Sequence, residues 1–341
     1  MKAINKISQV VALIMMTSTL MFTVSCKKEN SDEPTGSDHS ERLSDVKNPD
    51  VFNKSAFSPW RIKSSGIAAQ ERGILEMSEP DQLSCYGIIF DGFYTPTHDI
   101  TITHNGGATW HSQTVAGLEN NYIYGIAATT ASTVHLIGWN YLDGGGNVLR
   151  SRDGGHSWHR EAPNAYTDAA SFPDAIAFFN PADGVIIGDP QNGYFEIYTT
   201  SNGGNSWRRV PSKKIPAPLA NEYGTAYQTD IYNNTIWTIA LSLDNTGNVT
   251  GARLLQSDDK GLSWYVRNSS LTFSGAGDGT LKFRNRFVGL YKNNGILYRT
   301  TDGGTTWKVV HYSGKWFSFD FDNVPGKPGW WVSTGGGPAG T

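Results

Sequence analysis

A short motif that recurs five times constrains the fold of this 341-residue chain more than any other feature. Each copy contains an Asp or Asn, one or two Gly residues, and a Trp that closes the motif. The copies are Thr103–Trp110, Ser151–Trp158, Thr200–Trp207, Ser257–Trp264 and Thr300–Trp307. Their tryptophans lie 48, 49, 57 and 43 residues apart, a spacing that suits one four-stranded β-sheet per repeat. The repeat therefore predicts an all-β propeller in which each copy belongs to one blade.

The residue types in the motif suit a tight turn better than they suit catalysis. An Asp or Asn side chain accepts hydrogen bonds from N–H groups of its own turn, and Gly allows a positive φ. Trp begins the next strand and supplies a large apolar face for packing. We therefore predict a structural role for ten motif residues: Asn105, Trp110, Asp153, Trp158, Asn202, Trp207, Asp259, Trp264, Asp302 and Trp307.

The pattern between the motifs sets the number of blades that we expect. One blade is predicted from four strand-like segments: Asp174–Asn180, Asp183–Pro190, Glu196–Ser201 and Ser206–Pro211. Residues 316–323 and 329–335 also read as strands, and a strand around Trp60 would complete their sheet and close the ring. We expect six blades of four strands, or seven if the natural chain continues beyond Thr341.

The N-terminus has the order of an export signal, predicted to span residues 1–25. Lys2 and Lys6 give a positive region, Val10–Leu20 is apolar, and small residues lead to Cys26. The segment Phe22–Cys26 resembles the processing site of bacterial lipoproteins, in which the cysteine becomes the first mature residue and carries the lipid. This resemblance implies an exported protein anchored to the outer membrane, on its periplasmic or surface face, whereas the alternative is an ordinary signal peptide.

The segment after the predicted signal differs in composition from the rest of the chain. From Lys27 to Asp50 it has seven acidic and four basic residues and almost no apolar ones, so it cannot bury a core. We predict a disordered tether over residues 26–54 and a propeller over residues 55–341.

Two family resemblances follow from these residues. The motif resembles the Asp box of the bacterial neuraminidase repeat, which sialidases, sortilin-type receptors and other propellers share. The stretch Asp174–Pro190, followed by a motif and by Arg208–Pro211, looks like the photosystem II stability/assembly factor-like family. Glu222-Tyr223-Gly224 is similar to part of a Gly-Glu-rich loop in bacterial members of that family. The resemblance covers most of residues 55–341 and implies a non-catalytic binding or assembly propeller.

We therefore predict a cell-envelope lipoprotein that binds or assembles a protein or glycan partner through the rigid loops at its channel mouth. The alternative is a carbohydrate-active hydrolase, sialidase-like or another glycosidase, with two carboxylates about 5–10 Å apart. Its channel-face candidates are Asp189, Glu222 and Asp230. Converging carboxylates, or three converging arginines, would favour the enzyme, and a mixed, uncharged mouth would favour the binding module.

Other kinds of chemistry find little support in the sequence. The net charge of −3 gives no basic field for nucleic acid. The two cysteines, Cys26 and Cys85, form no metal-binding pattern, and we expect no metal and no cofactor. Gly335–Gly340 fits a dinucleotide-binding pattern, but Pro338 interrupts the loop. Trp60-Arg61-Ile62 is close to a sialidase arginine motif, although Lys63 stands where Pro is needed.

Overall fold

The computed structural model describes residues 64–67, 72–91, 97–271, 279–293, 295–310, 320–324, 326–327 and 329–337, together with the backbone of strand β1, Met21–Lys28. Almost all regular structure in this part of the chain is antiparallel β-sheet, with one short 3-10 helix, η2, at Ser212–Lys214. Within it, no helix is long and apolar enough to cross a membrane.

The first three motif-containing sheets each have four main strands in sequence order. Blade 1 contains β2 (Arg72–Ser78), β3 (Cys85–Asp91), β4 (Asp99–Thr103) and β5 (His111–Thr114). Blade 2 contains β6 (Asn121–Ala128), β7 (Val134–Asn140), β8 (Gly146–Ser151) and β9 (His159–Glu161). Blade 3 contains β10 (Pro173–Phe178), β11 (Gly184–Gly188), β14 (Tyr198–Thr200) and β15 (Arg208–Arg209). A small hairpin of β12 (Pro190–Gln191) and β13 (Tyr194–Phe195) joins its second and third strands.

Two further sheets carry the remaining motifs. Blade 4 contains β16 (Glu222–Tyr223), β17 (Thr229–Tyr232), β18 (Thr235–Leu243), β19 (Val249–Ser257) and β20 (Tyr265–Arg267). Both β16 and β17 pair with β18, so the innermost strand of this blade is split in two. Blade 5 contains β21 (Thr280–Phe283), β22 (Gly289–Asn293), β23 (Ile296–Thr300) and β24 (Lys308–Val309).

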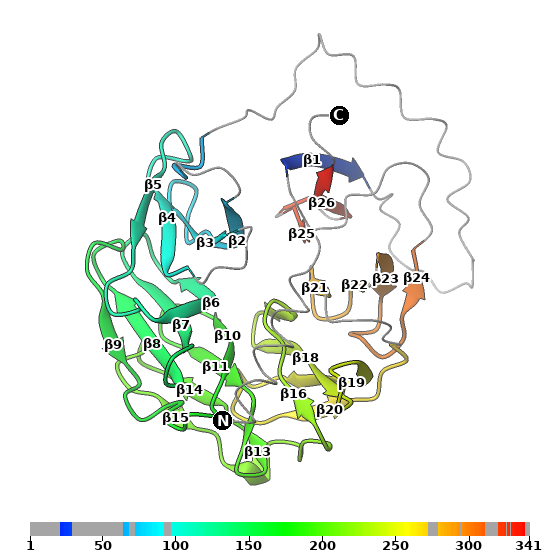
Figure 1. The fold of residues 1–341 in the computed structure, drawn as a ribbon. Helices are drawn as coiled ribbons and strands as arrows, with labels where there is room; N and C mark the ends of the chain where they lie inside the picture. The colour runs from blue at the N-terminus through cyan, green and yellow to red at the C-terminus, as the bar shows by residue number, and fades with distance from the viewer. Residues whose placement is uncertain are drawn as a thin grey trace.

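The sheets stand around a common centre, with β2, β6 and β10 on the inner side of the ring (Figure 1). This arrangement is a β-propeller, as the repeat predicted. The expectation of six or seven blades is wrong, because the described residues form five blades. Four of these have four strands, and blade 4 has a fifth because its innermost strand is split. The C-terminal strands β25 (Asp320–Asn323) and β26 (Trp330–Gly337) pair with each other and with β1, which makes a three-stranded sheet.

Several N-terminal predictions lie outside the described residues. The strand expected around Trp60 is among them, as are the predicted signal and tether apart from β1. The backbone of β1 covers the end of the predicted signal and the start of the predicted tether, and Cys26 pairs there with Val332 of β26.

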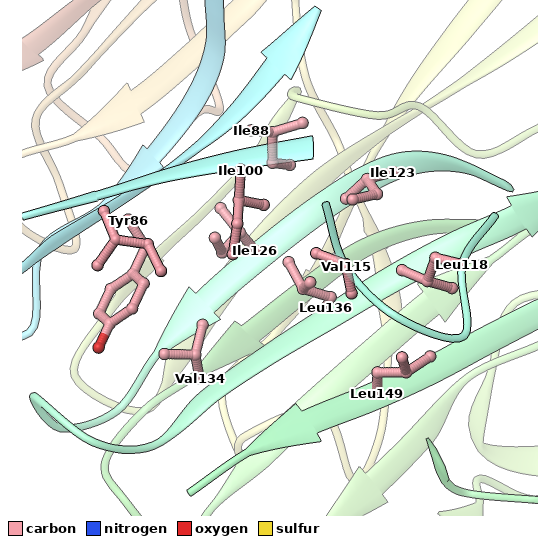
Figure 2. Close-up of a cluster of buried hydrophobic side chains, with 11 residues drawn as sticks. Tyr86, Ile88, Ile100, Val115, Leu118, Ile123, Ile126, Val134, Leu136 and Leu149 are labelled. Carbon is pink, nitrogen blue, oxygen red and sulfur yellow. The ribbon is translucent and has the colours of Figure 1, made fainter. Parts of the chain in front are cut away.

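The core consists of apolar clusters between neighbouring blades. Figure 2 shows the cluster between blades 1 and 2, in which Tyr86, Ile88 and Ile100 face side chains of the next sheet such as Ile126 and Leu136. Each of these five side chains is at most 3% exposed. Burial of such faces on both sides of a sheet fixes each blade against its neighbours.

The repeated motifs lie in the turns between the third and fourth strands, where they also touch the preceding blade. In blade 5, Oδ1 of Asp302 accepts hydrogen bonds from the Thr306 N–H at 2.8 Å and the Thr300 hydroxyl at 2.8 Å. Its Oδ2 accepts the Thr306 hydroxyl at 2.6 Å. Gly304 has a φ of 93°, and a Cβ placed there would lie 2.6 Å from the Leu254 side chain of blade 4. The motif carboxylate is therefore occupied within its turn, and its glycine allows the two blades to approach.

Innermost strands of blades 1, 2 and 3 each contain a β-bulge. The register shifts between Ile74 and Glu76, between Ile123 and Gly125, and between Pro173 and Ala175. A bulge adds a residue opposite one partner and re-aims the side chains beside it. This irregularity decides which side chains line the centre of the ring.

Candidate functional site

The propeller has two chemically different ends. Because successive strands alternate in direction, the motif turns lie at the end where the innermost strands finish. The opposite end is where the innermost strands begin, and we call it the channel mouth. It contains Tyr122 near the start of β6, Tyr141 just after β7, and Tyr223 in β16. Turn structure and candidate binding groups are therefore separated along the channel axis.

Aromatic side chains gather at the channel mouth. The ring of Tyr122 stacks on Trp139, with centroids 6.1 Å apart and planes 12° apart, and meets Tyr141 edge-on at 5.4 Å. Tyr122 and Tyr141 are half-buried, and Tyr223 is 36% exposed. The rings of Tyr122 and Tyr141 pack against the cluster of Tyr124 and Phe172, whose centroids are 4.7 Å apart. The mouth therefore offers rigid, partly exposed aromatic surface of the kind that binds sugars or protein segments.

Asp189 lies just after β11, and its carboxyl is buried near the mouth. Its Oδ1 accepts a hydrogen bond of 2.8 Å from the Gly224 N–H. Burial raises the pKa of Asp189 from its usual 3.8 to about 7, and the Gly224 hydrogen bond acts in the opposite direction. Asp174 is its buried neighbour, and burial followed by the charge of Asp189 raises the pKa of Asp174 well above its usual range. This pair is therefore held as carboxylic acid over much of the acidic range.

Asp230 lies on β17 and lines a small cavity in the channel. The cavity has a volume of about 80 Å³, and its other polar lining residues include Glu76, Tyr124, Asp174 and Tyr227. Burial raises the pKa of Asp230 to about 7 and that of Glu76 to about 8, although Lys282 lowers both. The Phe283 N–H donates a hydrogen bond to Asp230. Three carboxyl groups from three innermost strands therefore meet at one cavity.

Glu222, the third channel-face candidate, is used for structure. Arg253 pairs with its carboxylate, with Nε 2.6 Å from Oε1, and the Leu219 N–H donates to Oε2 at 2.8 Å. Glu222 is 3% exposed and does not line the cavity. The structure therefore brings Asp230 to the cavity, places Asp189 beside its wall residue Asp174, and leaves Glu222 in an ion pair.

Sequence reasoning missed four polar residues of the cavity: Glu76, Tyr124, Asp174 and Tyr227. Tyr124 and Asp174 are the extra residues of the bulges in β6 and β10, and Glu76 follows the bulge in β2. Tyr227 lies between the two halves of the split inner strand of blade 4 and has a φ of 66°. The signal available in the sequence was polar residues that interrupt apolar strand patterns, but a bulge is defined by the partner strand.

Among the described residues, the arginines considered for a sialidase-like site do not come together, and no metal site is formed. Arg253 is paired with Glu222, and Arg286 lies 4.0 Å from Asp258 on an exposed turn. Arg61 lies outside the described residues. No group of three or more His, Cys, Asp or Glu side chains in the described ranges is arranged to hold a metal ion.

Comparison with models of protein families and with curated proteins finds no match. Solved structures do match. YCF48 bound to a D1 peptide is 16% identical with a TM-score of 0.38, over 84% of this chain and 98% of that one. A GH74 xyloglucanase from Xanthomonas campestris is 15% identical with a TM-score of 0.51, over 74% of this chain and 42% of that one. An α-L-arabinofuranosidase from Fusarium graminearum is 13% identical with a TM-score of 0.50, over 77% of this chain and 93% of that one. This chain thus spans less than half of the xyloglucanase, and the similarity to these structures is one of fold.

Proposed function

We propose that this protein is a non-catalytic binding or assembly module of the cell envelope, and that its partner docks on the channel mouth. The observation that carries the proposal is the aromatic mouth above a cavity of about 80 Å³. Pockets that enclose a small-molecule ligand usually have volumes of about 300–1,000 Å³. A sugar ring therefore reaches the aromatic rim but has no room beside the buried carboxyl groups.

The anchor is part of the same proposal. A lipid on Cys26 would hold the propeller at the outer membrane through the acidic tether, with the partner either a protein or a glycan. Cys26→Ser is expected to abolish fatty-acid labelling in the producing cell, and labelling that persists would remove the anchor from the proposal.

A hydrolase is the second candidate because the carboxyl groups of Glu76, Asp174 and Asp230 converge on one cavity, which is the arrangement that would favour an enzyme. Glu76 and Asp230 have pKa values raised to about 8 and 7 and line the same cavity, so each can hold a proton near neutral pH as a general acid must. The small cavity is the argument against this role, since a glycosidase needs its acid beside the scissile bond.

A paired assay separates the two candidates. The full-length chain carrying Cys26→Ser, which keeps strand β1 but cannot take a lipid at Cys26, is incubated with sialylated and polysaccharide substrates, and released reducing sugar is measured. The same protein is tested for binding to isolated envelope fractions. We expect no sugar release, and binding that falls at least tenfold in the double variant Tyr122→Ala/Tyr141→Ala.

The matched control is Tyr265→Ala, which removes a 38% exposed tyrosine from the outer strand of blade 4. This variant should bind like the wild type. Sugar release that disappears in Asp230→Asn would establish the hydrolase instead. Binding that is unchanged by the double mouth variant would remove the mouth as the docking surface.

A further inference from the structure

The cavity below the mouth contains polar atoms that lack a hydrogen-bond partner. They are Glu76 Oε2, Tyr124 OH, Asp174 Oδ2 and Tyr227 OH, and all four residues line the same 80 Å³ space. Asp174 and Tyr124 are each 4% exposed. Leaving a buried polar group unpaired is unfavourable, and native structures seldom do so. Four such atoms around one cavity indicate a site built for a group that supplies hydrogen bonds.

The charge of the surroundings indicates which kind of group fits. Lys282 is an internal cation facing Glu76, Asp230, Asp320 and Asp322. Asp174 differs from these carboxyl groups, because its charged neighbour is Asp189 and no basic side chain lowers its pKa. The Asp174 side of the cavity therefore favours a positive charge. In their ionised form, the carboxylates of Asp174 and Glu76 only accept hydrogen bonds, so a group that binds this form must donate them.

The lining and the volume of the cavity further restrict which positively charged group can bind there. Tyr124 and Tyr227 belong to the aromatic cluster with Phe172, so aromatic rings stand beside the carboxyl groups. A cation is attracted to the face of an aromatic ring, most strongly where water is excluded. A space of 80 Å³ accommodates a few water-sized groups, which is enough for a planar guanidinium or a small ammonium.

We propose that this cavity binds a guanidinium or alkylammonium group presented by an arginine or lysine of a protein partner. The inference rests on the proposed function, since the aromatic mouth would hold the partner's backbone while the cationic group enters the cavity. The N–H groups donate to Asp174 Oδ2 and Glu76 Oε2, and the hydroxyl oxygens of Tyr124 and Tyr227 complete the site.

Calorimetry on the full-length Cys26→Ser chain tests this proposal with four probes. They are the N-acetyl amides of arginine, lysine and citrulline, and calcium chloride. Citrulline is the matched control for arginine, because it has nearly the same shape without the charge. We expect arginine or lysine to bind at least tenfold more tightly than citrulline. No binding, equal binding of arginine and citrulline, or binding of calcium alone would overturn the proposal.

Substitutions locate the site on the protein. Asp174→Asn is expected to weaken arginine binding at least tenfold, and Tyr124→Phe about threefold. A cooperative thermal unfolding transition in each variant shows that it is folded. Asp143→Asn, at an exposed aspartate in the loop after β7, is the control and should bind like the wild type. Arginine binding that survives Asp174→Asn unchanged would place the cation elsewhere and overturn the inference.

Proton release gives a readout that a merely structural role would not produce. In the empty site, burial raises the pKa values of Glu76 and Asp174, while Lys282, Asp189, Asp230 and Asp320 are the charged groups around them. Cation binding favours the ionised carboxylates, so affinity should rise from pH 6 to pH 9, with protons released to the buffer.

A free small-molecule cation is distinguished from an arginine of a protein partner by the size of the ligand. Agmatine, a free guanidinium compound, should bind no more tightly than the arginine amide, whereas arginine within an extended peptide should bind more tightly by contact with Tyr122 and Tyr141. Envelope binding that needs these tyrosines but not Asp174 would leave the proposed function standing and reject the cationic group.

Discussion

Asp189 and Gly224 are 35 residues apart in the chain, and the Gly224 N–H donates a 2.8 Å hydrogen bond to Oδ1 of the Asp189 carboxyl. A Cβ on Gly224 would collide with the carboxyl of Asp174. The glycine therefore allows two buried acidic groups to lie against one backbone segment, between blade 3 and the split inner strand of blade 4. An arrangement of this kind has consequences for stability as a function of pH.

The folding stability of the protein is expected to fall as pH rises from about 5 to 8. The pKa of Asp189 is raised from 3.8 to about 7 in the folded chain, and that of Glu76 from 4.5 to about 8. Between the unfolded and folded values the folded chain holds more protons, so each increase in pH favours unfolding. Above the pKa values of Asp189 and Glu76 in the folded chain, the loss of folding stability no longer increases with pH. Thermal unfolding midpoints measured from pH 5 to 9 should therefore decline and then level off.

Asp189→Asn tests the origin of this decline. The amide oxygen of Asn still accepts the Gly224 N–H but cannot ionise, so the variant should be more stable than the wild type at pH 8, on the order of a few kcal/mol. At pH 5 the two should differ little. The exposed Asp143→Asn should leave the pH profile unchanged. A profile of Asp189→Asn that is parallel to that of the wild type would show that this carboxyl is ionised in the folded chain.

The motif glycine that touches the preceding blade should be more sensitive than a glycine in an open turn. Gly304 has a φ of 93° and would place a Cβ 2.6 Å from Leu254, whereas Gly295 has a φ of 72° and meets nothing within 4 Å. Gly295→Ala should cost about 1–2 kcal/mol from backbone strain alone. Gly304→Ala should cost about 1–3 kcal/mol more because of overpacking between the blades. Urea denaturation of both variants measures the difference, and equal losses would remove the inter-blade contact as its cause.

The motif carboxylate is expected to tolerate an amide but not its removal. Asp302→Ala loses three hydrogen bonds from Thr300 and Thr306 and should lower the free energy of unfolding by about 1–3 kcal/mol. Asp302→Asn should retain most of the free energy of unfolding that Asp302→Ala loses. In two other motifs an Asn already has this role: Asn105 accepts the Thr109 N–H at 2.9 Å, and Asn202 accepts the Ser206 N–H at 2.9 Å. Chemical denaturation of the two variants decides this, and an equal loss in both would mean that the negative charge is required.

Much of the fold was predictable because its signals are local. The motif fixes a turn within eight residues, and its spacing sets one sheet per repeat. The strands β11 and β14 fall within segments expected from their residue pattern, and β10 begins one residue before its expected segment. The number of blades was harder to predict, because the strands at the two ends of the chain carry no motif. The sequence pattern predicted C-terminal strands with an N-terminal partner, but it placed that partner around Trp60, whereas β26 pairs with β1.

The candidate site was harder to predict for a related reason. Asp230 was selected as a channel residue and lines the cavity, but Tyr124 and Asp174 reach it through bulges. A bulge depends on which residue of the neighbouring strand lies opposite, and one strand's sequence does not contain that information. Glu222 shows the converse, since the charge that made it a candidate is neutralised by Arg253, 31 residues away.

The five motif tryptophans should differ in their contribution to stability, although the motif makes them look equivalent. Trp307 is 9% exposed, donates to the Gly304 carbonyl at 3.0 Å, and meets the rings of Phe283 and Tyr291 at 6.1 and 6.2 Å. Trp158 is only partly buried against its cluster. Trp307→Ala should therefore cost about 3–5 kcal/mol and Trp158→Ala less, measured by urea denaturation. Equal losses would mean that the tryptophan acts through its own turn, and a smaller loss at Trp307 would contradict its packing against Phe283 and Tyr291.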